Sequence, residues 1–141
     1  DSGSPPFTSL RDFLHSVNLV VRLLTNDEPA QAKRAAAAFA ANEIYIAKSV
    51  LLETEWVLRF SYRLDQAAIL RGLAALLGMA RVTAEDSVRV TAALDWYRAG
   101  MDFADALHLA SSIGSAQRFG TFDAKMARRA RAITPIEIAV I

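Results

Sequence analysis

The chain has 141 residues, of which 53% are hydrophobic and 22% charged, and its 16 basic residues nearly balance its 15 acidic ones. This size and composition favour a single folded domain and exclude an intrinsically disordered chain. The absence of cysteine excludes a disulfide-stapled scaffold and a zinc or iron–sulfur site built on thiolates. No apolar stretch approaches the roughly 20 residues of a membrane-spanning helix, and no signal peptide is recognisable, so we expect a cytoplasmic protein.

The pattern of apolar residues and helix-capping signals predicts short strands that alternate with helices. Residues 1–15 are expected to be an irregular lead-in, which is either natural or added to the chain. A first strand is expected within residues 9–17. Residues 18–25 are expected to continue that strand or to form a short helix. Helices are then predicted over 28–41, 49–61, 65–78, 85–99, 102–113 and 124–131, and strands over 44–47, 81–83, 118–122 and 136–141. Ser49 and Asp65 are expected to cap their helices, and Gly78 and Gly100 to end theirs. This alternation predicts an α/β fold in which a parallel β-sheet is flanked by helices, and sites in such folds form at the carboxyl ends of the strands.

Two aspartates open the helix predicted over 102–113. Asp102 and Asp105 are three residues apart and therefore share one face, in a first turn where the helix dipole favours anions. Helix capping explains Asp102 well and Asp105 less well. The pair is therefore either a capping arrangement or part of an acidic site.

Glu53 lies on an apolar arc of its predicted helix. Trp56, Val57 and Phe60 follow it at the third, fourth and seventh positions, so this arc is expected to face inward. A carboxylate in such a place must be paired or must bind a metal, because burying a bare charge is very costly. A buried salt bridge is the alternative to a metal site.

Two other carboxylates are easier to interpret. Glu55 precedes Arg59 by four residues, which predicts an ordinary surface ion pair. Asp123 follows a predicted strand and precedes a helix, so it is either an N-cap or a ligand at the strand end. Carboxylates gathered from separate elements would select Mg²⁺ or Mn²⁺ rather than Zn²⁺, and such ions commonly act on phosphates.

Positive charge is concentrated close to Asp123 along the chain. Five basic residues lie between 118 and 131: Arg118, Lys125, Arg128, Arg129 and Arg131. They form either a solvated helix face or a set of contacts to the phosphates of a nucleic acid.

Motifs of several other enzyme classes are absent from the sequence. There is no P-loop, no GxGxxG dinucleotide motif and no Gly-x-Ser-x-Gly elbow. A receiver-like or phosphatase-like domain is a remote alternative, because a DxD motif is lacking. His108 is expected to pack or to lie on the surface rather than to bind metal, and Trp56 and Trp96 are expected in the core.

Four stretches, taken in order, resemble the PIN domain of VapC-type toxins. They are NLVVRLLTNDEPAQ (18–31), SVLLETEWVLR (49–59), GMDFADALHLA (100–110) and FGTFD (119–123). The resemblance covers residues 16–141 and implies a single PIN-like domain with a three-layer α/β/α fold. It also implies an Mg²⁺- or Mn²⁺-dependent endoribonuclease that acts on RNA, forms a homodimer and is neutralised by a VapB-type antitoxin.

The resemblance assigns roles by position in the chain. It implies that the catalytic residues are Glu53, Asp105 and Asp123. It implies that the metal ligands are Glu53, Asp102, Asp105 and Asp123. Thr121 would orient water, and Arg118, Lys125, Arg128 and Arg129 would hold the RNA backbone.

One position departs from the family pattern. The family opens with an aspartate at the end of its first strand, and here Ser16 takes that place, although the nearby Asn18 matches. Asp12 is no substitute if this segment is a strand, because four residues would place it about 13 Å away. Either the chain is a naturally weakened member, or its N-terminus differs from that of the natural protein. A catalytically inactive PIN-like module that binds RNA or an antitoxin is therefore the alternative function.

Overall fold

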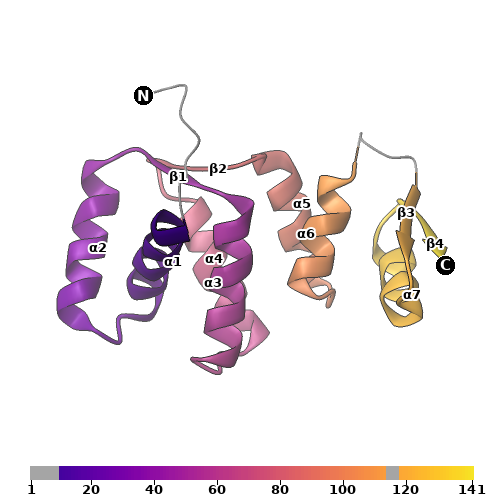
Figure 1. Cartoon of the computed structure of the whole chain (residues 1–141), viewed down its shortest axis with the longest axis horizontal. Coiled ribbons are helices and arrows are strands. Elements are labelled where there is room, and N and C mark those ends of the chain that lie inside the picture. The colour runs from indigo at the N-terminus through magenta and orange to yellow at the C-terminus, as the bar shows by residue number, and fades with distance from the viewer. Residues whose placement is uncertain (1–9, 114–117) are drawn as a thin grey trace. The chain divides into compact units, whose positions relative to one another are not determined.

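The structure, a computed structural model, describes residues 10–113 and 118–141. Two compact units make up these residues, one ending at Glu85 and the other beginning at Asp86 (Figure 1). None of the helices within the two described ranges is long and apolar enough to cross a membrane.

The first unit contains four helices and a pair of short strands in the described residues. In chain order these are α1 (Leu10–Thr25), α2 (Pro29–Ala41), β1 (Ile44–Ile46), α3 (Lys48–Phe60), α4 (Gln66–Leu77) and β2 (Val82–Ala84). β1 and β2 pair in parallel, with Ile44 opposite Val82 and Ile46 opposite Ala84. A strand, a helical connection and a parallel strand are what the alternating pattern predicted.

The strand expected within residues 9–17 is wrong, because α1 is one continuous helix from Leu10 to Thr25. Val17, Val20 and Val21 are all buried, and their spacing of three and four residues is the helical period. Residues 10–15, expected to be irregular, are therefore helical, whereas residues 1–9 lie outside the described part of the chain. In a helix, Asp12 and Ser16 share one face and are about 6 Å apart along the axis, so the distance that excluded Asp12 does not apply.

The start of α3 is held by a residue far along the chain. Ser49 was expected to cap this helix, but the helix begins at Lys48 and its N-cap residue, Ala47, makes no side-chain cap. Instead, the backbone N–H of Lys48 donates to Oε1 of Glu85, which follows β2, at 2.9 Å. The backbone N–H of Glu85 in turn donates to the carbonyl of Ile46 at 2.8 Å. A tertiary contact thus replaces the local cap that the sequence suggested.

The turn after α1 is fixed to the end of α3 by a polar cluster. Arg22 donates to Oδ1 of Asp27 at 3.1 Å and to the Tyr62 hydroxyl at 2.7 Å, and that hydroxyl donates to Oδ2 of Asp27 at 2.8 Å. Thr25 adds a hydrogen bond to Oδ1 of Asp27 at 2.9 Å. The hydrogen bond from Tyr62 is the main reason that the pKa of Asp27 lies below its ordinary value; the Thr25 hydroxyl and the Arg22 charge lower it further.

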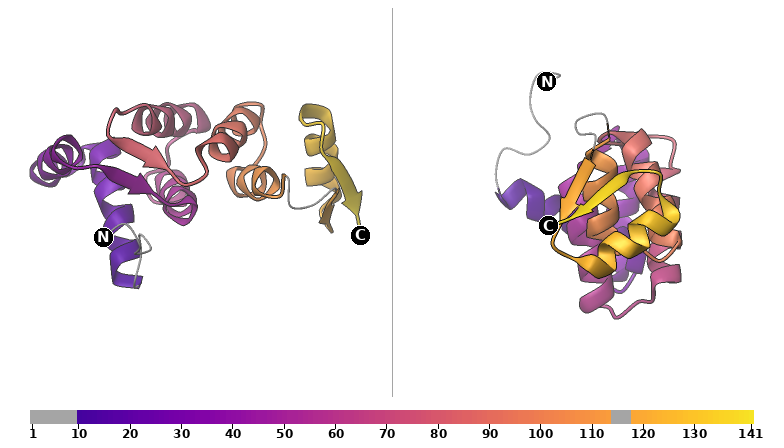
Figure 2. Two further views of the ribbon diagram at one scale, coloured as in Figure 1. Left: turned by 90° about the horizontal axis from the view of Figure 1, so that it is seen from above. Right: turned by 90° about the vertical axis from the view of Figure 1, so that its right-hand side faces the viewer.

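The second unit contains α5 (Ser87–Arg98), α6 (Phe103–Ser111), β3 (Arg118–Thr121), α7 (Ala124–Ile133) and β4 (Glu137–Val140). β3 and β4 pair in parallel, with Arg118 opposite Glu137 and Thr121 opposite Val140. α7 packs against this pair, and Figure 2 shows the three elements together at the C-terminal end of the chain. α5 and α6 pack on each other, with the rings of Tyr97 and Phe103 edge to face at 5.2 Å.

The two parallel pairs confirm an α/β arrangement. The continuous parallel sheet flanked by helices is visible only in part, because the described strands form two separate pairs, β1–β2 and β3–β4. In the second unit, β3, α7 and β4 form a strand–helix–strand connection that brings the carboxyl end of β3 directly to the start of α7. Asp123 lies at this junction.

Candidate functional site

The tight turn between α5 and α6 sets the position of the first acidic pair. Gly100 has φ +108°, a conformation that L residues with a side chain rarely adopt, and it reverses the chain after α5. Asp102 then forms the N-cap of α6, its Oδ2 accepting from the backbone N–H of Asp105 at 3.3 Å. The capping interpretation of Asp102 is therefore confirmed. Asp105 makes no such cap; it lies half-buried in the first turn.

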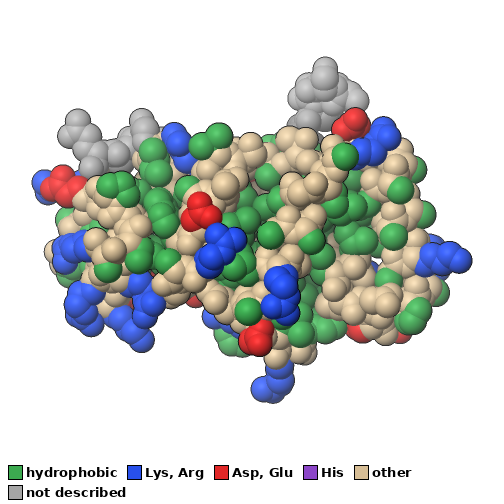
Figure 3. All heavy atoms as spheres, turned by 180° about the vertical axis from the view of Figure 1, so that it is seen from behind, with side chains coloured by type: hydrophobic (Ala, Val, Ile, Leu, Met, Phe, Trp, Pro, Cys, Tyr) green, Lys and Arg blue, Asp and Glu red, His purple; other side chains and the backbone are tan. Residues whose placement is uncertain are grey.

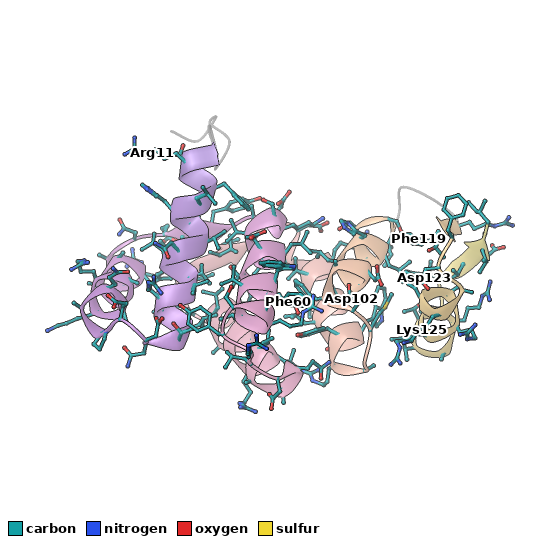
Figure 4. The ribbon with its side chains drawn as sticks, turned by 60° about the horizontal axis from the view of Figure 1, so that its bottom comes forward. Arg11, Phe60, Asp102, Phe119, Asp123 and Lys125 are labelled. Atoms are coloured by element: carbon teal, nitrogen blue, oxygen red, sulfur yellow. The ribbon has the colours of Figure 1, made fainter. Side chains whose placement is uncertain are left out.

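Asp105 is the carboxylate with the most perturbed environment in the second unit. Burial raises its pKa, and the negative charges of Asp102 and Asp123 raise it further, whereas His108 acts in the opposite direction. The charge of Asp123 reaches Asp105 although Asp105 belongs to α6 and Asp123 precedes α7. Figure 4 shows Asp102 and Asp123 at the starts of their helices. The three aspartates therefore share one electrostatic neighbourhood.

Asp123 is held by two hydrogen bonds at the carboxyl end of β3. Its backbone N–H donates to Oγ1 of Thr121 at 3.0 Å, and its Oδ1 accepts from the backbone N–H of Met126 at 3.0 Å. The predicted N-cap and the predicted place at a strand end are thus both present. The next residue back, Phe122, is 83% exposed, and an aromatic ring in that position was not singled out in the sequence.

Glu53 and its helix differ from the prediction. Trp56 is 50% and Phe60 52% exposed, so the arc that was expected to face inward does not, and Trp56 is not a core residue. Glu55, expected on the surface, is only 3% exposed and pairs with Arg59, Nε to Oε2 at 3.0 Å. The buried side of α3 is instead formed by Val50, Leu51, Thr54, Glu55 and Leu58.

The exposed aromatic side of α3 has an internal contact of its own. The rings of Trp56 and Phe60 lie 5.1 Å apart, and the Arg59 guanidinium lies 4.6 Å from the Phe60 ring centre. Glu53 is half-buried on this helix. Because Glu53 belongs to the first unit and the aspartates to the second, their convergence stays a prediction.

The carboxylate oxygens present are the donor type that a hard divalent cation prefers. In residues 10–113 and 118–141, however, the structure shows no group of three or more acidic or histidine side chains arranged to hold an ion. Asp102, Asp105 and Asp123 thus supply suitable chemistry without forming a complete coordination shell.

A comparison with protein families now bears on these residues. The PIN domain family matches residues 17–132, which include Glu53 and all three aspartates. The chain belongs to the PIN domain family. PIN domains are commonly metal-dependent nucleases, and those nucleases bind RNA. Neither the curated proteins nor the solved structures contain a match to the chain.

The structure divides the basic residues of this PIN domain protein into two groups. Arg118 pairs with Glu137 at 2.8 Å, and Arg131 donates to the carbonyl of Ile138 at 2.8 Å, so both contribute to the packing of β4. The other three, Lys125, Arg128 and Arg129, are exposed and line a cavity of about 420 Å³ together with Ala99, Ala132 and Ile133. Figure 3 shows Lys and Arg side chains gathered over the end of the chain that carries α7.

Proposed function

We propose that the chain is an Mg²⁺- or Mn²⁺-dependent endoribonuclease of the VapC toxin type, which acts in the cytoplasm as a homodimer and is neutralised by a VapB-type antitoxin. Membership of the PIN family supports the nuclease class. The observation that carries the proposal is the position of Asp105, which lies half-buried in the first turn of α6 beside the capping Asp102. Burial and the like charges of Asp102 and Asp123 raise the pKa of Asp105. Titratable groups perturbed in this way are concentrated at functional sites, and a divalent cation would relieve the repulsion.

Each acidic residue has a role in this proposal. Asp102, Asp105 and Asp123 would hold the ion together with Glu53. When bound, the ion would neutralise phosphoryl oxygens and lower the pKa of a water molecule. Thr121 holds the backbone of Asp123 through its hydroxyl, which would also orient the attacking water.

The chain's surface next to Asp123 suits single-stranded RNA. Lys125, Arg128 and Arg129 would contact backbone phosphates, and Arg118 at the start of β3 would add a further contact. The exposed ring of Phe122 offers a stacking platform for a base, because stacking accepts any base.

A second candidate is a catalytically inactive PIN-like module that binds RNA or an antitoxin partner. Two observations favour it. Residue 16 is serine where the resemblance places the first aspartate, and the family match begins one residue later. The described residues also lack a group of three metal-binding side chains. One observation argues against the inactive module: Asp12 lies on the same face of α1 as Ser16 and could supply the missing carboxylate.

Both candidates are tested by incubating a labelled single-stranded RNA with the full chain in Mg²⁺, Mn²⁺ or EDTA. The nuclease proposal expects cleavage only with a divalent ion and its loss in Asp105→Asn. Asp95→Asn, which alters an exposed aspartate paired with Arg98 on α5, is the matched control and should cleave normally.

The inactive module expects RNA binding without cleavage in either ion. Ser16→Asp then distinguishes a weakened enzyme from a binding module, because only a weakened enzyme should gain cleavage together with Mn²⁺ affinity measured by calorimetry. If Asp12→Asn abolishes a cleavage activity already present, Asp12 supplies the carboxylate that residue 16 lacks.

A further inference from the structure

We propose that the cavity beside α7 is a binding subsite for one nucleotide, in which cations hold a phosphate and an apolar wall takes the attached sugar or base. This inference rests on the proposed RNA substrate and names the part of the chain that grips it. All of the lining residues belong to the second unit.

One side of α7 carries both cationic and apolar side chains. These side chains follow one another at steps of three, one, three and one residues, so they share one side of the helix: Lys125, Arg128, Arg129, Ala132 and Ile133. The cations occupy the half nearest the start of α7, and the apolar side chains occupy the other half. A nucleotide has two corresponding parts, a charged phosphate and a flat base whose faces pack against apolar groups.

The three cations have few competing contacts. Within residues 10–113 and 118–141 the structure shows no ion pair for Lys125, Arg128 or Arg129, in contrast to Arg118 and Arg131, which are engaged by β4. Three guanidinium or ammonium groups directed to one cavity repel one another, and a phosphate would offset that repulsion.

The turn at Gly100 forms the other wall of the cavity. A Cβ atom on Gly100 would lie 2.5 Å from Nη1 of Arg129, so the guanidinium of Arg129 rests close against the backbone of this turn. The neighbouring Ala99 lines the same cavity. The turn that leads to Asp102 and the helix that follows Asp123 therefore form its two sides.

The size and position of the cavity favour a nucleotide over a simple ion. A volume of about 420 Å³ lies within the roughly 300–1,000 Å³ of small-molecule sites and far exceeds what a phosphate alone requires. Lys125 lies in the first turn of α7, the helix that Asp123 caps (Figure 4), so the cationic half of the cavity is at the end of α7 that carries Asp123. A nucleotide bound there would hold an RNA chain close to the proposed point of cleavage.

The test measures binding of adenosine 5′-monophosphate to the full chain by calorimetry at low salt in EDTA, which needs neither metal nor cleavage. We expect saturable binding that weakens as salt rises, and at least tenfold weaker binding by Arg128→Gln/Arg129→Gln. Arg71→Gln, which removes an exposed arginine of α4, is the control and should bind normally. Circular dichroism confirms that each variant is folded.

Ala132→Trp fills the apolar side of the cavity and leaves every cation in place. This variant should therefore no longer bind the nucleotide, whereas its affinity for inorganic phosphate should be unchanged. Equal affinity for phosphate and the nucleotide would overturn the nucleotide subsite, as would unchanged binding in the double variant. Tighter binding of a glutamate-rich peptide that displaces the nucleotide would show a protein-docking surface instead. If the chain binds the nucleotide but never cleaves RNA, the nuclease proposal is wrong and the subsite is supported. If the chain cleaves RNA but does not bind the nucleotide, the subsite is wrong and the nuclease proposal is supported.

Discussion

Asp123 has two separable tasks, and a pair of substitutions distinguishes them. Its Oδ1 accepts from the backbone N–H of Met126 at 3.0 Å and so caps α7, and its negative charge contributes to the acidic neighbourhood of Asp105. Asp123→Ala removes both. Asp123→Asn removes only the charge, because asparagine caps helices about as well as aspartate.

The expected loss of stability in Asp123→Ala follows from the loss of this single capping hydrogen bond. Loss of an N-cap side chain costs about 1 kcal/mol of the free energy of unfolding, which for a chain of this length lowers Tm by about 4 °C. We therefore expect Asp123→Ala to melt about 4 °C below the wild type and Asp123→Asn to melt close to it. Both variants should lose metal-dependent RNA cleavage.

Thermal melting by circular dichroism and cleavage of a labelled RNA are measured on the same preparations. If Asp123→Asn melts as low as Asp123→Ala, the cap in the structure is not what stabilises α7. If Asp123→Asn cleaves RNA at the wild-type rate, the charge of Asp123 is not needed and its assignment as a metal ligand is wrong.

Two further predictions concern the first unit. Arg59→Leu should lower the free energy of unfolding by about 2 kcal/mol, because Glu55 is only 3% exposed and loses the guanidinium that lies 3.0 Å away. This loss is smaller than for a fully buried ion pair, because Arg59 itself is partly exposed. Arg98→Leu breaks an exposed pair on α5 and should cost no more than about 0.5 kcal/mol in the same urea titration, so equal effects would refute the burial of Glu55. The pKa of Asp27 in the folded chain lies below its ordinary 3.8, chiefly because Tyr62 donates a hydrogen bond to its carboxylate. The ionised carboxylate therefore stabilises the fold above pH 3.8, and this stabilisation is lost as the pH falls through the pKa of the folded chain. Asp27→Asn should therefore be less stable than the wild type at neutral pH and equal to it in strong acid; a difference that persists in acid would contradict this.

The elements with local signals were predicted well. Asp65 caps α4 by accepting from Ala68 at 2.8 Å, and Gly78 ends that helix, as the sequence indicated. Asp102 and Asp123 are N-caps for the same reason, since a capping side chain acts within three residues. Asp123 also lies at the carboxyl end of β3, the kind of position where sites of α/β folds form, whereas Asp102 follows the helix α5.

The errors arose where two interpretations satisfy one pattern. The segment 9–25 has apolar residues dense enough for a strand or a helix, and only the burial of Val17, Val20 and Val21 shows the helical period. α3 is apolar on more than one side, so its sequence did not reveal that Glu55, rather than Trp56, is on the buried face. Packing against distant elements decides such cases.

The basic residues near Asp123 are a further case that the sequence alone could not resolve. Arg118 and Arg131 could not be separated from Lys125, Arg128 and Arg129 by sequence, because their partners belong to β4, which follows later in the chain. The role of Gly100 was likewise expected only as a helix stop. Its second effect, the space it leaves for Arg129, depends on α7 reaching the turn between α5 and α6.

The most direct test of the metal site is Mn²⁺ titration of the ¹⁵N-labelled full chain, followed by paramagnetic broadening of backbone amide signals. We predict that substoichiometric Mn²⁺ broadens the amides of Asp105 and Asp123 first and that of Glu53 with them, and that Asp105→Asn abolishes this effect. Broadening at Asp105 and Asp123 without Glu53 would remove Glu53 from the site. Amides that stay sharp at all three residues, while exposed acids such as Glu137 broaden, would contradict a metal-dependent nuclease centre in this chain.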